Sequence, residues 1–349
     1  MSVIVPAYNT AQFIAATLDS VFAQTLKDFE VIVVNDGSPD TDDLERVLEP
    51  YRERIVYLKQ ENRGLAGARN TGIRHARGKY LALLDSDDCW PPEYLAAQMK
   101  CFEETPALDL VYSDARLFGD VPLDRPTFMQ TSNPPATFEA LLVEGSQIIP
   151  SGTVVRREMV IEAGWFDESL RCCEDVDLCL RIAHRRARIA FQRGVMVLRR
   201  VHSDSLTKDG AKLLEDKERV LTKLVRTLEL SPEARSILLS RLAYVKAHAD
   251  LEKGKRYLRS GDVGQARKFL SEAYAFFRRT DRQPTGGGRE EPGATLEHPF
   301  LRRAKLRVLL WGVQAAPRLT AWVAKRWQSG LSQPATPGTS EGRGSKPLN

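Results

Sequence analysis

The sequence is informative first through what it lacks. Its five cysteines form no Cys-x-x-Cys pair, so we expect reduced thiols in a cytoplasmic protein rather than a disulfide framework. No run of about 20 uncharged apolar residues predicts a transmembrane helix, and the N-terminal residues show no secretory signal pattern. Neither GxGxxG nor GxxxxGKS/T follows the first expected strand, which argues against a dinucleotide cradle and against a P-loop.

The composition is that of an ordinary globular chain. Its 349 residues are 42% hydrophobic and 28% charged, which provides enough apolar material for a sizeable core. The net charge of +5 is modest for this length, and it gives no reason to expect nucleic acid as a partner.

Strands and helices alternate through the first 113 residues. Five short apolar segments do not alternate with polar residues, which predicts strands buried on both faces; they are residues 2–5, 29–34, 55–58, 80–84 and 108–112. Segments with apolar residues at helical spacing separate them. Repeated βα units of this kind predict an α/β fold with a doubly wound, mostly parallel sheet and helices on both faces.

Polar side chains gather where four of these strands end. The segments that follow the strands are residues 6–9, 35–38, 61–64 and 85–88. In parallel sheets the carboxyl ends of the strands meet at one edge, and ligands bind there. We therefore expect these four segments to contribute to one ligand site.

Three carboxylates, Asp85, Asp87 and Asp88, crowd the end of the fourth strand. They repel one another unless a cation lies among them, and Mg²⁺ and Mn²⁺ take such oxygen ligands and often share them with phosphates. The alternative is a polar turn in which Asp87 or Asp88 caps a helix that begins near Pro91. Asp85 and Asp87, on alternate residues, are able to reach one metal and one ribose, and we leave the cap to Asp88.

Four ordered sequence blocks resemble the family 2 glycosyltransferases of the GT-A fold. They are residues 2–9 (SVIVPAYN), 33–38 (VVNDGS), 61–72 (ENRGLAGARNTG) and 84–88 (LDSDD). The resemblance covers roughly residues 1–205, with a nucleotide-sugar binding half (1–113) and an acceptor half (114–205). It implies a nucleoside-diphosphate sugar donor, Mg²⁺ or Mn²⁺ as cofactor, and inversion at the anomeric carbon.

The resemblance also implies roles for single residues. Those around the nucleotide are Pro6, Ala7, Tyr8 and Asn9 (nucleoside), Asp36 and Gly37 (uracil or an equivalent base), Arg69 (near the nucleotide), and Asp85 and Ser86 (ribose). The metal ligands are Asp87, Asp85 and His202. For Asp36 the alternative is an ordinary turn residue in an Asp-Gly pair, and for His202 it is a structural hydrogen bond.

In the acceptor half, Glu174 and Asp175 stand in the first turn of an expected helix. The helix dipole stabilises acids at this position, which explains their charge but not a function. The resemblance places the general base of the transfer at Asp175, and Glu174 remains the alternative base or a residue that orients the acceptor. Residues 120–135 are rich in Pro, Asp and Thr and predict a surface loop.

The last third of the chain has a different character. Residues 211–280 predict helices and include a hairpin similar to a tetratricopeptide unit, with Gly261 at its turn. A single hairpin of this kind cannot bury its own apolar face, so it needs neighbouring helices or a protein partner. Residues 281–300 predict a flexible linker and 329–349 a disordered tail. Residues 301–328 mix Trp and Leu with Lys and Arg and contain no acids, which predicts an in-plane helix on an anionic membrane; docking on the protein's own core is the alternative.

Together with these patterns, the resemblance implies a metal-dependent inverting glycosyltransferase of the hexosyltransferase type. We expect a UDP-sugar as donor and a saccharide or lipid-linked acceptor, in cell-surface polysaccharide or glycolipid synthesis. We expect the protein in the cytoplasm, peripheral on the inner face of the cell membrane. A sugar nucleotidyltransferase is the alternative enzyme, and an inactive scaffold that acts through its helical region is the alternative outside enzymes.

Overall fold

The computed structural model describes residues 1–121, 128–129, 136–144, 148–202 and 210–280, together with residues 307 and 310. The expected linker, the expected tail and all but two residues of the basic segment 301–328 therefore lie outside the described residues, as does most of the expected loop 120–135. The described chain divides into two compact units, with the boundary between Ala249 and Asp250.

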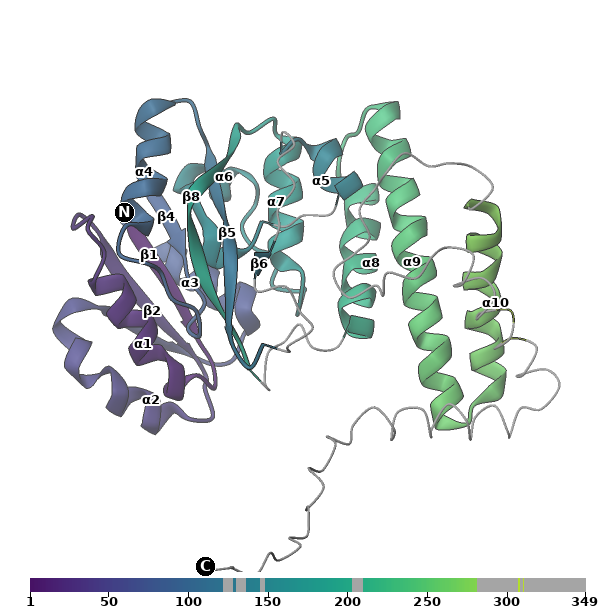
Figure 1. Cartoon of the computed structure of the whole chain (residues 1–349), viewed down its shortest axis with the longest axis horizontal. Helices are drawn as coiled ribbons and strands as arrows, with labels where there is room; N and C mark the ends of the chain where they lie inside the picture. Colours follow the sequence, from purple (N-terminus) through teal and green to yellow (C-terminus); the bar gives the residue numbers. More distant parts are fainter. Residues whose placement is uncertain are drawn as a thin grey trace, which may run out of the picture. The chain divides into compact units, whose positions relative to one another are not determined.

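Four parallel strands form the N-terminal part of the sheet, in the order β3-β2-β1-β4. They are β1 (Ser2–Ala7), β2 (Glu30–Asp36), β3 (Val56–Gln60) and β4 (Tyr80–Leu83). The connections contain α1 (Ala11–Phe22), α2 (Thr41–Leu48), a 3-10 helix (Glu49–Arg54) and α3 (Gly64–His75). Because every connection returns the chain to the same starting edge, all four strands end at the opposite edge (Figure 1).

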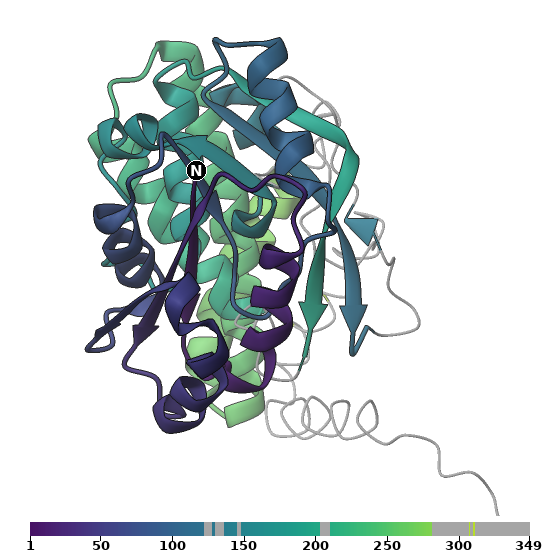
Figure 2. The same ribbon diagram turned by 90° about the vertical axis from the view of Figure 1, so that its left-hand side faces the viewer.

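Four further strands extend the sheet beyond β4. They are β5 (Leu110–Gly119), β6 (Phe128–Met129), β7 (Thr153–Arg156) and β8 (Ile189–Val201). β7 runs antiparallel to both β4 and β5, β6 runs antiparallel to β5, and β8 lies parallel beside β5 (Figure 2). The predicted mostly parallel, doubly wound α/β sheet is thereby confirmed.

The strands supply two hydrophobic cores, one on each face of the sheet. In β1, Val3 and Val5 belong to one core, and Ile4 between them belongs to the other, as the period of two in a strand requires. The first core includes α1, α2 and α4 (Tyr94–Glu104). The second includes α3, α5 (Phe138–Glu144), α6 (Arg157–Glu162) and α7 (Glu174–His184).

Three helices follow the sheet, and the predicted helical C-terminal region is confirmed. They are α8 (Gly210–Thr227), α9 (Pro232–Ser260) and α10 (Val263–Thr280). Val220, Leu224 and Leu238 are fully buried in the same core as α7, so α8 and the first part of α9 belong to the sheet-containing unit. No helix in the described ranges is both long enough and apolar enough to cross a membrane.

The second unit contains the end of α9 and α10, joined by a turn at Gly261, whose φ is +87°. The two helices approach closely, because a Cβ placed on Gly254 would lie 2.7 Å from Cγ of Leu270. The rings of Tyr257 and Phe269 stack with their centroids 5.6 Å apart. The end of α9 and α10 therefore form a packed helical hairpin with Gly261 at its turn.

Candidate active site

The polar segments that follow β1, β2 and β4 contact one another directly. The backbone N–H of Asn9 donates to Oγ of Ser38 (2.6 Å), and Oγ of Ser86 donates to Oγ1 of Thr10 (2.9 Å). Thr17 of α1 also donates to the carbonyl of Ser86 (2.9 Å). These strand ends therefore lie together at the edge of the sheet where ligands of such folds bind.

Asp36, the last residue of β2, is a fixed and nearly buried carboxylate. It is 2% exposed, and its Oδ1 accepts hydrogen bonds from Nε2 of Gln60 (2.7 Å) and from the backbone N–H of Arg63 (2.8 Å). Gly37 follows with a φ of +63°, and a Cβ there would lie 2.7 Å from the backbone nitrogen of Asn62. The turn thus requires glycine at this position. The two hydrogen bonds to Oδ1 hold the Asp36 carboxylate in one orientation.

The segment after β1 presents one large side chain to solvent. Pro6 and Ala7 are buried at the end of the strand, whereas Tyr8 is 51% exposed. Asn9 adopts a left-handed backbone conformation with a φ of 55°, which turns the chain toward α1. Of residues 6–8, Tyr8 is therefore the residue whose ring is accessible to a ligand.

Asp88 is an internal residue, so its assignment as a helix cap is wrong. The chain after β4 pairs with β8 before it turns, and α4 begins only at Tyr94, with Glu93 in the N-cap position. Asp88 instead points inward and accepts hydrogen bonds from Oγ of Ser151 (2.6 Å) and from the backbone N–H of Arg200 (2.8 Å). Burial, and then the charges of the two neighbouring aspartates, raise the pKa of Asp88 well above its usual value.

Asp87 and His202 lie together although 115 residues separate them in the chain. Oδ2 of Asp87 is 2.9 Å from Nε2 of His202, and the His202 ring packs on Phe13 with ring centroids 4.8 Å apart. Burial, and then the charge of Asp85, raise the pKa of Asp87, while His202 lowers it. The carboxylates after β4 thus repel each other in the absence of a cation.

The Asp87–His202 pair fits a divalent cation. Oδ2 of Asp87 and Nε2 of His202 lie 2.9 Å apart, close enough for both atoms to hold one cation. No group of three or more His, Cys, Asp or Glu residues suited to a metal occurs in the described part of the chain. The remaining coordination positions would therefore fall to phosphate oxygens and water, as is usual for Mg²⁺.

Arg69 connects Asp85 with Glu174 inside the protein. Nη2 of the buried Arg69 donates to Oδ1 of Asp85 (2.6 Å), and Nη1 donates to Oε1 of Glu174 (2.5 Å). Burial by itself would lower the pKa of this guanidinium, but the charges of Asp85 and Glu174 outweigh it and raise that pKa. Arg69 is therefore an internal counter-ion that ties Asp85 to Glu174.

Glu174 and Asp175 open α7, as the sequence predicts, but they differ in environment. Glu174 is buried, and burial raises its pKa to about 7 although Arg69 opposes the shift. Asp175 is half-buried, and burial also raises its pKa. Its Oδ1 accepts the backbone N–H of Val176 (2.8 Å), and it takes part in no ion pair within the described ranges. Asp175 is thus the more available of the two carboxylates.

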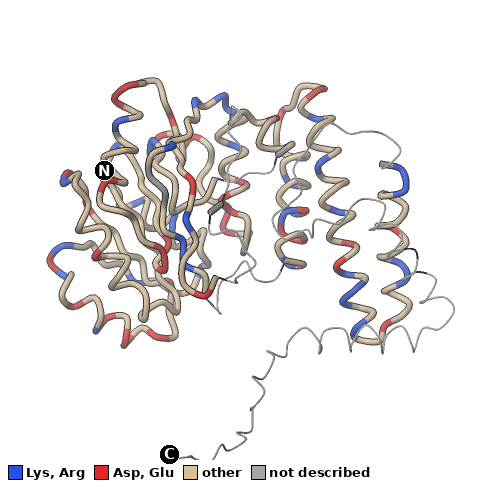
Figure 3. The backbone as a smooth tube through the Cα atoms, viewed as in Figure 1, with Lys and Arg blue, Asp and Glu red and all other residues tan. Residues whose placement is uncertain are grey.

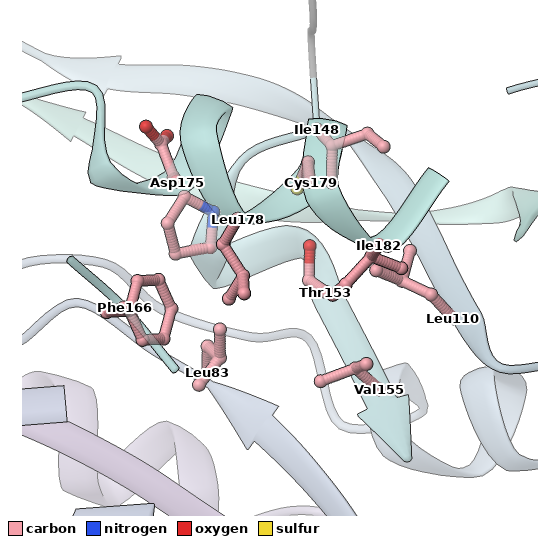
Figure 4. Close-up of a pocket in the computed structure, with 11 residues that line it drawn as sticks. Leu83, Leu110, Ile148, Thr153, Val155, Phe166, Asp175, Leu178, Cys179 and Ile182 are labelled. Atoms are coloured by element: carbon pink, nitrogen blue, oxygen red, sulfur yellow. The ribbon is translucent and has the colours of Figure 1, made fainter. Parts of the chain in front are cut away.

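An apolar pocket lies beside Asp175 (Figure 4). Strands β4, β5 and β7 and helix α7 contribute to its lining, which includes Leu83, Leu110, Val155, Leu178 and Ile182. The carboxylate of Asp175 points away from these apolar side chains.

Sequence reasoning missed two polar residues that shape the site. Ser151 accepts the backbone N–H of Asp85 (3.1 Å) while its hydroxyl donates to Asp88, and it lies in a 3-10 turn (Pro150–Gly152) directly before β7. The Pro-Ser-Gly sequence is a turn signal that could have revealed it. Asn70 binds both the backbone N–H and the carbonyl of Phe166, and no local pattern predicts that contact.

Comparison with solved structures identifies the class of fold. Staphylococcus aureus TarS 1–349 in complex with UDP-GlcNAc has a TM-score of 0.58 and 18% sequence identity, and the match covers 94% of this chain and 91% of that one. The mannosyltransferase PcManGT from Pyrobaculum calidifontis, in complex with GDP-Man and Mn²⁺, has a TM-score of 0.55 and 21% identity over 94% of this chain and 87% of that one. At these identities the likeness shows the fold alone, which is the GT-A type.

Comparison of sequences identifies the family. The model of the family described as glycosyl transferase family 2 matches residues 2–163. An uncharacterized glycosyltransferase of Rickettsia prowazekii (strain Madrid E) is 31% identical over 228 residues, which are 62% of this chain and 69% of that protein. For uncharacterized glycosyltransferases of three other Rickettsia species, the match spans only 31% to 35% of their length. The chain belongs to glycosyl transferase family 2.

Proposed function

We propose that the protein transfers a sugar from a nucleoside diphosphate, most simply UDP, to an acceptor hydroxyl with inversion at the anomeric carbon and with Mg²⁺ or Mn²⁺ as cofactor. One observation carries the proposal: Arg69 joins Asp85, at the donor end of β4, to Glu174, which adjoins Asp175. This ion pair brings a carboxylate suited to proton abstraction close to the edge where a nucleotide would bind. Neighbours of the same fold that hold UDP-GlcNAc, or GDP-Man with Mn²⁺, support it.

The donor side offers matching groups to a uridine nucleotide. One oxygen of Asp36 is fixed by two N–H donors, which leaves the other for an N–H group of the base. Asp85, held by Arg69, can accept a hydrogen bond from a ribose hydroxyl, and the exposed ring of Tyr8 can stack on the base. Asp87 and His202 would hold the divalent cation, which when bound offsets the charge of the leaving diphosphate.

On the acceptor side we assign the general base to Asp175. Its carboxylate takes the proton of the acceptor hydroxyl while that oxygen attacks the anomeric carbon, and the bond from this carbon to the diphosphate oxygen breaks. A single in-line displacement of this kind inverts the configuration. The raised pKa of Asp175 brings the carboxylate closer to the basicity that proton abstraction at neutral pH requires. Glu174 is paired with Arg69, so in this assignment it has a positioning role and does not take the proton.

Two measurements test this assignment. Asp175→Asn keeps the shape of the side chain but removes the base, so turnover should fall by about 100-fold or more, whereas the affinity for UDP with Mn²⁺, measured by calorimetry, should not change. Glu174→Gln is the matched control and should lose less turnover. Unchanged turnover in Asp175→Asn, with turnover lost in Glu174→Gln, would transfer the role to Glu174. UDP affinity that is the same with and without Mn²⁺ would exclude the metal from donor binding.

We further propose a saccharide or lipid-linked acceptor at the inner face of the cell membrane. Basic residues recur along the end of α9 and along α10 (Figure 3). Residues 250–280 contain eight Lys and Arg but only four Asp and Glu. The segment 301–328 is basic and contains no acids. An excess of Lys and Arg next to aromatic residues favours binding to anionic lipid.

A further inference from the structure

Helix α8 follows the last strand of the sheet, and it binds the helix that carries Asp175. Nζ of Lys223 on α8 donates to Oδ1 of Asp177 (2.8 Å) and to Oδ2 of Asp167 (2.6 Å). Asp177 is a fully buried residue of α7, two positions after Asp175, and Asp167 lies in the loop that leads to α7. One lysine therefore joins three segments of the chain.

Arg181 completes the contacts of Asp177 from within α7. Its Nε and Nη2 donate to Oδ2 of Asp177 at 2.9 and 2.6 Å. The same guanidinium donates to the backbone carbonyls of Ala163 and Trp165. Both oxygens of this buried carboxylate thus meet a cation, and loss of either partner would leave one oxygen without its cation inside the protein.

The other end of the Lys223 contact is also well defined. Oδ1 of Asp167 accepts hydrogen bonds from the backbone N–H and the hydroxyl of Ser169 (3.0 and 2.7 Å). Burial by itself would raise the pKa of Asp167, but the hydrogen bonds from Lys223 and Ser169 lower it to about 2. Asp167 is therefore charged throughout the neutral range, and its ion pair with Lys223 persists there.

Apolar contacts keep α8 in place beside α7. Val220, Leu221 and Leu224 are buried in the same core as Leu178 and Ile182 of α7. The two helices contact each other along this core, and Figure 1 shows them side by side. The ammonium group of Lys223 therefore approaches α7 from a packed surface rather than from a mobile one.

We propose that Lys223 is a positioning residue for the general base, because it fixes the rotation of α7 about its own axis. Residues 175 and 177 lie about 200° apart around a helix, so Lys223 holds the side of α7 that faces away from the Asp175 carboxylate. A rotation of about 10° would move a carboxylate that lies about 5 Å from the axis by about 1 Å. Displacements of this size can cost about 100-fold in rate. This inference rests on the proposed role of Asp175.

The test compares variants of the full chain under saturating donor and Mn²⁺. Lys223→Met should lower kcat by between about tenfold and about 100-fold, while the Kd for UDP stays within about twofold, because the donor contacts are not touched. Asp167→Asn weakens the same contact from its partly exposed end and should lower kcat in the same direction, by less. Lys246→Met is the control: Lys246 pairs with Glu218 of α8 (3.9 Å), and kcat should not change.

The outcomes separate this inference from the proposed function. Wild-type kcat in Lys223→Met overturns the inference, and so does a parallel loss of UDP binding, which would indicate general damage. If Lys223→Met does not fold, Asp167→Asn decides: wild-type kcat there overturns the inference as well. Full activity in Asp175→Asn would remove the base that Lys223 is said to position. An inactive Asp175→Asn with an unimpaired Lys223→Met would refute the positioning role alone.

Discussion

Replacing Arg69 with Met would remove the buried cation that Asp85 and Glu174 share, while keeping a long side chain in its place. The side chains of Arg69 and Glu174 are 1% and 5% exposed, whereas that of Asp85 is 32% exposed and stays partly hydrated. Glu174 therefore loses its partner without gaining water. Loss of one partner of a buried ion pair costs about 3–5 kcal/mol. We expect the free energy of unfolding to fall by about 3 kcal/mol at about pH 6. This is the lower end of the range, because Glu174 can take up a proton there and become neutral.

The loss of stability should grow as the pH rises. In the wild type the folded-state pKa of Glu174 is about 7, above its ordinary value, and Arg69 keeps it from rising further. In Arg69→Met this folded-state pKa rises, so above pH 7 the folded variant retains a proton that the unfolded chain has released. Stability is then lost with increasing pH, by about 1.4 kcal/mol per pH unit above about pH 7, and the wild type does not share this loss.

Urea unfolding at about pH 6 and about pH 8.5, followed by tryptophan fluorescence, measures both effects. Arg63→Met is the matched control, since Arg63 is 47% exposed in its ion pair with Glu168. Such surface pairs contribute less than about 1 kcal/mol, so the control should lose little at either pH. An Arg69→Met protein as stable as the wild type, or one with an equal deficit at both pH values, would refute the counter-ion role of Arg69.

Three other predictions concern separate parts of the chain. Ser151→Ala leaves the buried Asp88 without one of its donors, so the free energy of unfolding in urea should fall by about 1–3 kcal/mol; an unchanged midpoint would contradict this. His202→Gln should weaken the Mn²⁺-dependent part of UDP binding by about tenfold or more and leave metal-free binding unchanged in calorimetry. A chain that ends after Gly288 lacks the basic segment 301–328, and it should no longer pellet with anionic liposomes while it still binds UDP; equal pelleting of both forms would exclude the segment as the membrane anchor.

The donor half of the sheet could be predicted because its signals are local. Uninterrupted apolar runs mark β1 to β4, and the strand ends follow from the runs. The prediction for β5 was too short, because this strand continues from Tyr112 to Gly119 along a parallel partner, β8, whose residues lie far away in the sequence. The local pattern of apolar residues cannot predict a partner strand that is distant in the sequence.

The partners of the charged side chains could not be predicted for the same reason. Asp88 looked like a helix cap because Pro91 follows it closely, but its hydroxyl donor, Ser151, is 63 residues away. The sequence placed Arg69 near the nucleotide and gave no sign of its contact with Glu174, which lies 105 residues further on. Residue types and strand ends indicated where the site lies, and only the folded chain defines which carboxylate each cation meets.

The packing of α8 against α7 has a consequence for exchanging parts between related enzymes. A chimera that joins residues 1–205 of this chain to foreign helices would remove Val220, Leu221 and Leu224 from a core that they share with α7. Apolar surface next to Asp175 would then be exposed or repacked against an unmatched partner. A junction within α9, between Ala249 and Asp250, leaves that core intact and follows the boundary between the two compact units. The C-terminal helices should therefore be exchanged at a junction in the middle of α9 rather than at the end of the sheet.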